Sequence, residues 1–123
     1  MEDADFRHLV IEAGGVPVGF VILAGITSRS FVIELRRMLV ADKGRGIGSA
    51  ALTCSLHLAF HDLGAQEVWL DFVDHNSRAH HLYAKHGFRV DASSRATAEI
   101  NGTQARLVKM TLSRPEFDAL HGP

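Results

Sequence analysis

The chain lacks several features that would mark other classes of protein. Cys54 is the single cysteine in 123 residues, which excludes an internal disulfide. No apolar run is long enough to cross a bilayer and no signal peptide is recognisable, so the sequence predicts a reducing, cytoplasmic setting without a membrane partner. The formal net charge of -1 gives no general attraction to nucleic acid.

The length and composition are those of one folded domain. A chain of 123 residues, 46% of them hydrophobic, is large enough to bury a core. It contains no internal repeat, linker or low-complexity segment. We therefore predict a single domain over residues 1–123, with a flexible tail over residues 114–123 that contains Pro115 and ends in Gly122 and Pro123.

The first third of the chain has the alternating pattern of antiparallel strands. Two predicted strands, over residues 8–13 and 16–24, flank the tight turn Gly14-Gly15. A third strand is predicted over residues 31–40. These strands precede any predicted helix, which favours an α/β domain that opens with a hairpin.

Helical and strand patterns alternate in the rest of the chain. A long helix is predicted over residues 46–63, a buried strand over 67–73 and a second helix over 77–86. Asn101-Gly102 is a strong signal for a type I′ turn, and the chain returns from it through a last strand over residues 105–112.

Three alternating glycines lie between the third predicted strand and the first helix, in the run Lys43-Gly44-Arg45-Gly46-Ile47-Gly48-Ser49. Glycines at a helix N-terminus leave backbone N–H groups uncovered, and these groups together with the helix dipole attract an anion such as phosphate. No acidic residue lies between Asp42 and Asp62, whereas the loop carries two cationic side chains. The loop is therefore predicted to hold an external anion.

The glycine spacing leaves the identity of that anion open. A P-loop requires a Gly-Lys-Ser/Thr ending, but this loop ends Ile47-Gly48-Ser49. In a dinucleotide-binding fingerprint Ser49 would occupy the place of the third glycine, although Asp71 lies at about the distance of the ribose-binding acid. The hairpins before the loop argue against that fold, which opens with its glycine-rich unit. A turn that binds nothing is a further alternative.

A second block follows the buried strand, from Asp74 to Phe88. Together the two blocks resemble the GNAT superfamily of N-acetyltransferases. The coenzyme A loop of that family has the form (Arg/Gln)-x-x-Gly-x-(Gly/Ala), which residues 43–48 fit with lysine in the first place. The second block of the family, Asn-x-x-Ala-x-x-Leu-Tyr-x-Lys-x-Gly-Phe, is matched by Asn76, Ala79, Leu82, Tyr83, Lys85, Gly87 and Phe88. The resemblance covers about residues 8–113.

The resemblance implies a mixed, mostly antiparallel sheet with a central strand–glycine loop–helix unit. It implies an enzyme that transfers an acetyl group from acetyl-CoA to a primary amine by direct attack in a ternary complex, without a metal. A backbone N–H of Leu39 or Val40 would face the developing oxyanion. The cofactor-binding residues that it implies are Met38, Leu39 and Val40 in the strand, Lys43, Gly44, Arg45, Gly46, Ile47, Gly48 and Ser49 in the loop, and Asn76, Ala79 and Tyr83 in the second block.

Two residues are candidates for proton transfer in such a reaction. Tyr83 is placed by the resemblance to protonate the leaving thiolate, although a tyrosine on a helix can equally serve packing alone. An acceptor amine with a pKa of about 10.4 must lose a proton before it attacks. Glu34, four residues before Met38, is the candidate base, and the alternative is that it only pairs with Arg36 or Arg37.

The resemblance is to a short form of the family. Members usually begin with a strand and two helices that form one wall of the acceptor site, whereas this chain begins almost directly in the first hairpin. Either a partner subunit supplies that wall, or the acceptor groove is open, or the start of the sequence is truncated. Exposed sheet edges make a homodimer a further hypothesis. A non-catalytic module that binds acyl-CoA and acts through a partner is the alternative to an enzyme.

Cys54, His57 and His61 could share one face of the first helix and bind a metal. No glutamate follows His57 as in the H-E-x-x-H motif, and Cys54 is predicted to lie on an apolar stripe. We therefore predict no metal site.

Overall fold

The computed structural model describes residues 5–27, 29–41 and 46–122. The chain forms two compact units, residues 1–68 and residues 69–123. The prediction that the whole chain is one domain stays a prediction. Within the described ranges, no helix combines the length and the apolar character that a membrane span requires.

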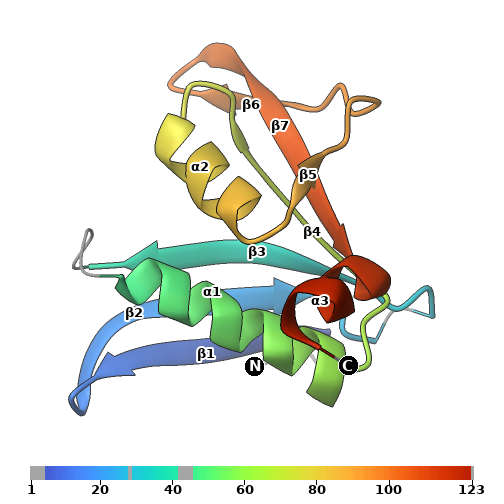
Figure 1. Ribbon diagram of the computed structural model, residues 1–123. Helices are drawn as coiled ribbons and strands as arrows, with labels where there is room; N and C mark the ends of the chain where they lie inside the picture. The colour runs from blue at the N-terminus through green and yellow to red at the C-terminus, as the bar shows by residue number, and fades with distance from the viewer. Residues whose placement is uncertain (1–4, 28, 42–45, 123) are drawn as a thin grey trace. The chain divides into compact units, whose positions relative to one another are not determined.

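The first unit contains three antiparallel strands and one long helix. The strands β1 (Phe6–Ala13), β2 (Val16–Ala24) and β3 (Val32–Val40) lie side by side in that order. The helix α1 (Ile47–His57) continues into the π-helical turn η1 (Leu58–Asp62) and lies across one face of the three strands (Figure 1). The predicted hairpin, third strand and long helix are confirmed.

The sharp turn between β1 and β2 depends on its two glycines. Gly14 and Gly15 have φ angles of 58° and 80°, a region that other residues rarely adopt. Two successive positive φ angles are typical of the type I′ turn, whose twist matches that of the flanking strands. The turn therefore fixes the register in which Ala13 faces Val16.

β3 carries one extra residue relative to β2. Leu35 faces Leu23 and Arg37 faces Ile22, so Arg36 forms a β-bulge between them. The bulge breaks the alternation of the strand, because Leu35 is buried whereas Arg36 and Arg37 are both exposed. The guanidinium of Arg36 lies 4.9 Å from the centroid of the Phe6 ring, which holds the bulged side chain against β1.

The core of the first unit is made by one face of the strands and one face of the helix. Cys54 does not belong to it: its side chain is exposed, so its predicted place on an apolar stripe is wrong. The apolar positions of this helix continue beyond the face that is buried, and Cys54 lies at the border of that face. The buried apolar residues are Val21, Leu23, Ala24, Ile33, Leu35, Ala51, Leu52, Leu56, Ala59, Phe60, Ala65 and Val68.

The second unit is arranged around its longest strand, β7. β7 lies between β4 and β5, and it also pairs with β6. Asn101 and Gly102, between β6 and β7, have φ angles of 51° and 78°, which confirms the predicted type I′ turn. The two-residue strand β5 was not predicted. The elements are β4 (Glu67–Val73), α2 (Ser77–Lys85), β5 (Arg89–Val90), β6 (Thr97–Ile100), β7 (Thr103–Ser113) and α3 (Arg114–His121).

The prediction of a flexible tail from residue 114 is wrong, because residues 114–121 form the helix α3 (Figure 1). Ser113 and Glu116 form a capping box: the Ser113 hydroxyl accepts the Glu116 N–H at 3.3 Å, and the Glu116 carboxylate accepts the Ser113 N–H at 2.9 Å. Pro115 lies in the first turn, where its missing N–H costs nothing. Phe117 is fully buried, so α3 belongs to the core.

Candidate functional site

The start of α1 has the features expected of an anion site. Gly46, the N-cap, has a left-handed conformation with φ 76°, and the first turn contains no acidic residue. A Cβ atom built at Gly46 or Gly48 would meet nothing within 4 Å. The first N–H groups of a helix have no intrahelical partner, so those of Ile47 and Gly48 are available to bind an anion.

Of the other residues predicted in the loop, Lys43, Gly44 and Arg45 lie outside the described residues. Ser49 lies in the first turn of α1, and its carbonyl accepts the hydroxyl of Thr53 at 3.0 Å.

At the end of β3, successive backbone N–H groups point alternately toward β2 and away from it. The Ala41 N–H donates to the Val18 carbonyl at 2.6 Å, toward β2. Since neighbouring residues of an extended strand alternate, the Leu39 N–H also points toward β2 and the Val40 N–H points to the opposite edge. Of the two predicted oxyanion donors, the geometry therefore favours Val40. Met38 and Val40 are half-buried, whereas Leu39 is exposed.

Gly19 lets β2 approach the end of β3 closely, and the sequence analysis missed it. It faces Val40, and a Cβ atom at this position would collide with the backbone carbonyl oxygen of Leu39. A signal was present, because an isolated glycine inside a strand pattern often marks a close backbone approach. Gly19 therefore helps to set the backbone position of the predicted cofactor strand.

Glu34 is paired with Arg36, as one of the two interpretations of the sequence predicts. Its Oε1 accepts from Arg36 Nε at 3.1 Å and from Nη2 at 2.8 Å. The Glu34 side chain is 17% exposed and that of Arg36 50% exposed. The pair holds the carboxylate in one orientation through Oε1. Its role as a base stays a prediction.

Asn76 begins the helix α2. Its side-chain oxygen accepts the Ala79 N–H at 3.1 Å, which is a standard N-cap hydrogen bond. Ala79 is half-buried in the first turn. The cap occupies the carbonyl oxygen of the Asn76 amide, so a ligand of this side chain would be bound by the amide NH₂ group.

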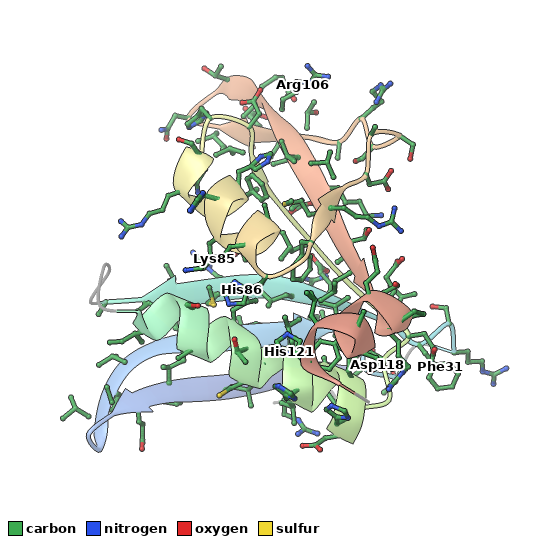
Figure 2. The ribbon with its side chains drawn as sticks, in the orientation of Figure 1. Phe31, Lys85, His86, Arg106, Asp118 and His121 are labelled. Atoms are coloured by element: carbon green, nitrogen blue, oxygen red, sulfur yellow. The ribbon has the colours of Figure 1, made fainter. Side chains whose placement is uncertain are left out.

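Tyr83 lies on the same helix, between two aromatic rings. Its ring centroid is 5.7 Å from that of Phe72 and 5.9 Å from that of Phe88. Burial raises the pKa of the Tyr83 phenol above its ordinary value of 10.0. The hydroxyl is therefore protonated at neutral pH, the state that a proton donor needs. Figure 2 shows Lys85 and His86 following it at the C-terminal end of α2.

The two histidines that the sequence offers as metal ligands lie against each other. The rings of His57 and His61 stack with their centroids 5.4 Å apart and their planes 16° apart. Among the described residues, no group of three or more His, Cys, Asp and Glu side chains could hold a metal.

This chain belongs to the acetyltransferase (GNAT) family, whose sequence model matches residues 1–88. The spermidine N(1)-acetyltransferases of Escherichia coli K12 and O157:H7 are each 25% identical to it over 122 residues, which are 98% of this chain and 66% of each relative. The chain thus spans just under two thirds of the length of these relatives.

Solved structures of spermidine N-acetyltransferase from Vibrio cholerae have the same fold. A mutant form superposes with a TM-score of 0.86 at 24% identity, covering 94% of this chain and 69% of that one. A dodecameric structure gives a TM-score of 0.84 at 23% identity, covering 94% and 68%. The fold class predicted from the sequence is confirmed by these matches.

Proposed function

We propose that this chain is an acetyl-CoA-dependent N-acetyltransferase that acetylates a primary amine. The observation that carries the proposal is the open start of α1, which follows β3 in a chain of the GNAT family and holds neither an acidic residue nor a Cβ atom where a diphosphate would lie. Polyamines are the first acceptors to test, because the relatives are named for acetylation of spermidine.

The parts of the cosubstrate are assigned to separate groups of residues. The diphosphate is assigned to the N–H groups of Gly46 to Ser49, assisted by Lys43 and Arg45. The thioester and its pantetheine arm are assigned to the backbone of Met38 to Val40, with the amide NH₂ of Asn76 and the backbone near Ala79 as further contacts. The open start of α1 and the direction of the Val40 N–H, away from β2, support this assignment.

The reaction requires two proton transfers and stabilisation of one oxyanion. The neutral amine attacks the thioester carbonyl carbon, a C–N bond forms, and the C–S bond breaks. The Val40 N–H stabilises the oxyanion, a contact worth about 3 kcal/mol when it is preorganised. Glu34 accepts the proton that the amine loses, and Tyr83 donates a proton to the leaving thiolate. The raised pKa of Tyr83 supports its role, because the phenol is fully protonated at neutral pH.

Thiol release from acetyl-CoA in the presence of spermidine, with the product mass measured, tests this function. Release of one thiol per acetylated amine is the expected result. Binding of acetyl-CoA without transfer to polyamines, other small primary amines or peptide lysines would contradict it and favour the non-catalytic acyl-CoA-binding module.

Gly48→Ala is expected to weaken acetyl-CoA binding roughly tenfold to a hundredfold, because the methyl group displaces the diphosphate from charge-assisted hydrogen bonds. The same change is expected to stabilise the free protein by up to about 1 kcal/mol, since alanine is the better helix former. Calorimetry and thermal unfolding measure the two effects. As a control, S-acetylpantetheine, which lacks the diphosphate, should bind both proteins equally. Equal acetyl-CoA affinities would contradict the assignment of the diphosphate.

Glu34→Gln is expected to lower the rate of transfer at neutral pH roughly a hundredfold for an amine with a pKa of about 10.4. The remaining activity should rise with pH, because the amine then loses its proton to solvent. The matched control is Arg37→Gln, an exposed neighbour on the same strand, which should leave the profile unchanged. A variant with the pH–rate profile of the original protein would remove Glu34 from the mechanism.

We also propose that the chain self-associates in solution, at least as a homodimer. One structure of the Vibrio cholerae relative is dodecameric, which supports this proposal. Sedimentation of a monomer at micromolar concentrations would contradict it.

A further inference from the structure

Three neighbouring strands of the first unit each place one residue in a row that includes Glu34. Phe6 of β1 faces Ala24 of β2, and Ala24 faces Glu34 of β3 (Figure 1). Residues that face each other across antiparallel strands direct their side chains to the same face of the sheet. The residue in the middle of the row has only a methyl group, so a long side chain from β3 has room to extend over it toward β1.

Arg36 is the side chain that extends in this way. It follows Glu34 by two residues and forms the β-bulge of β3, and a bulge changes the direction of the side chain that it carries. Its guanidinium lies 4.9 Å from the centroid of the Phe6 ring, and the same group donates two hydrogen bonds to Glu34. The tip of Arg36 is therefore held between an aromatic ring of β1 and a carboxylate of β3.

This pairing uses only one of the two carboxylate oxygens of Glu34. Both guanidinium donors, Nε at 3.1 Å and Nη2 at 2.8 Å, bond to Oε1. Within the described part of the chain Oε2 accepts no hydrogen bond. It is nevertheless open to solvent, because Asp118 Oδ1 is the one side-chain atom of that part that is both buried and without a partner. The pair thus fixes the carboxylate through one oxygen and leaves the other one accessible.

We propose that Arg36 is a positioning residue for acetyl transfer, which holds Glu34 so that Oε2 is presented to the amine that loses its proton. This inference rests on the proposed function and on the role of Glu34 as the base. An unrestrained glutamate side chain samples several rotamers, and it must give up that freedom each time it accepts a proton in the transition state. A base that is already held in its reactive orientation avoids this loss.

Arg36→Gln is expected to lower kcat about tenfold and to leave the affinity for acetyl-CoA unchanged, because Glu34 is then directed at the amine only part of the time. The melting temperature should change little, since the Arg36 side chain is 50% exposed and such ion pairs contribute little to stability. Phe6→Leu removes the ring beneath the guanidinium and should cause a smaller loss of the same kind. The matched control is Arg37→Gln, which changes an exposed neighbour and should keep the full rate.

A double-mutant cycle separates positioning from a purely structural role. When Glu34 is already glutamine, Arg36→Gln should cause no further loss of kcat, because no base remains to be positioned. Losses that multiply in the double variant would overturn the inference, and so would a full rate in either single variant; acetyl transfer itself would still stand. Absence of thiol release by the original protein with every amine tested would instead contradict the proposed function, and this inference with it.

Discussion

Tyr83→Phe is expected to slow acetyl transfer about 10²- to 10⁴-fold and to leave the affinity for acetyl-CoA almost unchanged. The hydroxyl donates a proton only when the C–S bond breaks, so its loss affects the transition state and not the bound cosubstrate. Phenylalanine keeps the ring between Phe72 and Phe88, and the fold should therefore be retained. Steady-state kinetics and calorimetric titration of acetyl-CoA measure the two quantities.

The dependence on the leaving group makes this test sharper. An acetyl thioester of a more acidic thiol needs less protonation as it departs, so the defect of Tyr83→Phe should shrink with that donor. His81→Ala, a change of an exposed side chain on the same helix, provides the matched control and should keep full activity. If Tyr83→Phe turns over acetyl-CoA as fast as the original protein, Tyr83 serves packing alone.

Phe117→Ala is expected to destabilise the protein by about 3–5 kcal/mol, a large part of the total stability of a small domain. Phe117 is fully buried in α3, and its ring centroid lies 4.7 Å from that of His121. Truncation leaves a cavity that the surrounding core fills only in part. Thermal unfolding should show a melting temperature lower by roughly 10–25 °C.

Leu120→Ala is the control for this prediction. Leu120 lies on the same helix but is 58% exposed, so its truncation should have a much smaller effect. Equal melting temperatures for the two variants would contradict the contribution of Phe117 to the core.

The two tight turns of this chain were predictable because each requires a backbone conformation that few residue pairs adopt. Gly14-Gly15 and Asn101-Gly102 both occupy positive φ angles, which few other residue pairs tolerate. The helix α3 was missed because the segment contains Pro115 and ends in Gly122 and Pro123, which favoured a flexible tail. Proline breaks a helix when it lies in the interior, but it is tolerated in the first turn. The spacing of Ser113 and Glu116 was the capping-box signal for a helix start at this point.

Less of the candidate site could be predicted. The motif placed Gly48 at a helix start and Tyr83 on a helix, because the glycine spacing and the helical periodicity are both visible in the sequence. The bulge at Arg36 was not visible, because an extra residue in one strand depends on the register of its partner. The helix cap made by Asn76 shows that a polar residue of the second block has a structural role beside the binding role that we propose for it.

Thermal unfolding in the presence of acetyl-CoA, CoA or NAD is the most direct test of the central claim that this chain binds and uses acetyl-CoA. A ligand at a hundred times its dissociation constant adds about 2.7 kcal/mol, which raises the melting temperature of a domain of this size by several degrees. We expect this rise with acetyl-CoA and with CoA but not with NAD. A rise with NAD alone, or no rise with either CoA compound, would contradict the assignment of the loop before α1 and the proposed function with it.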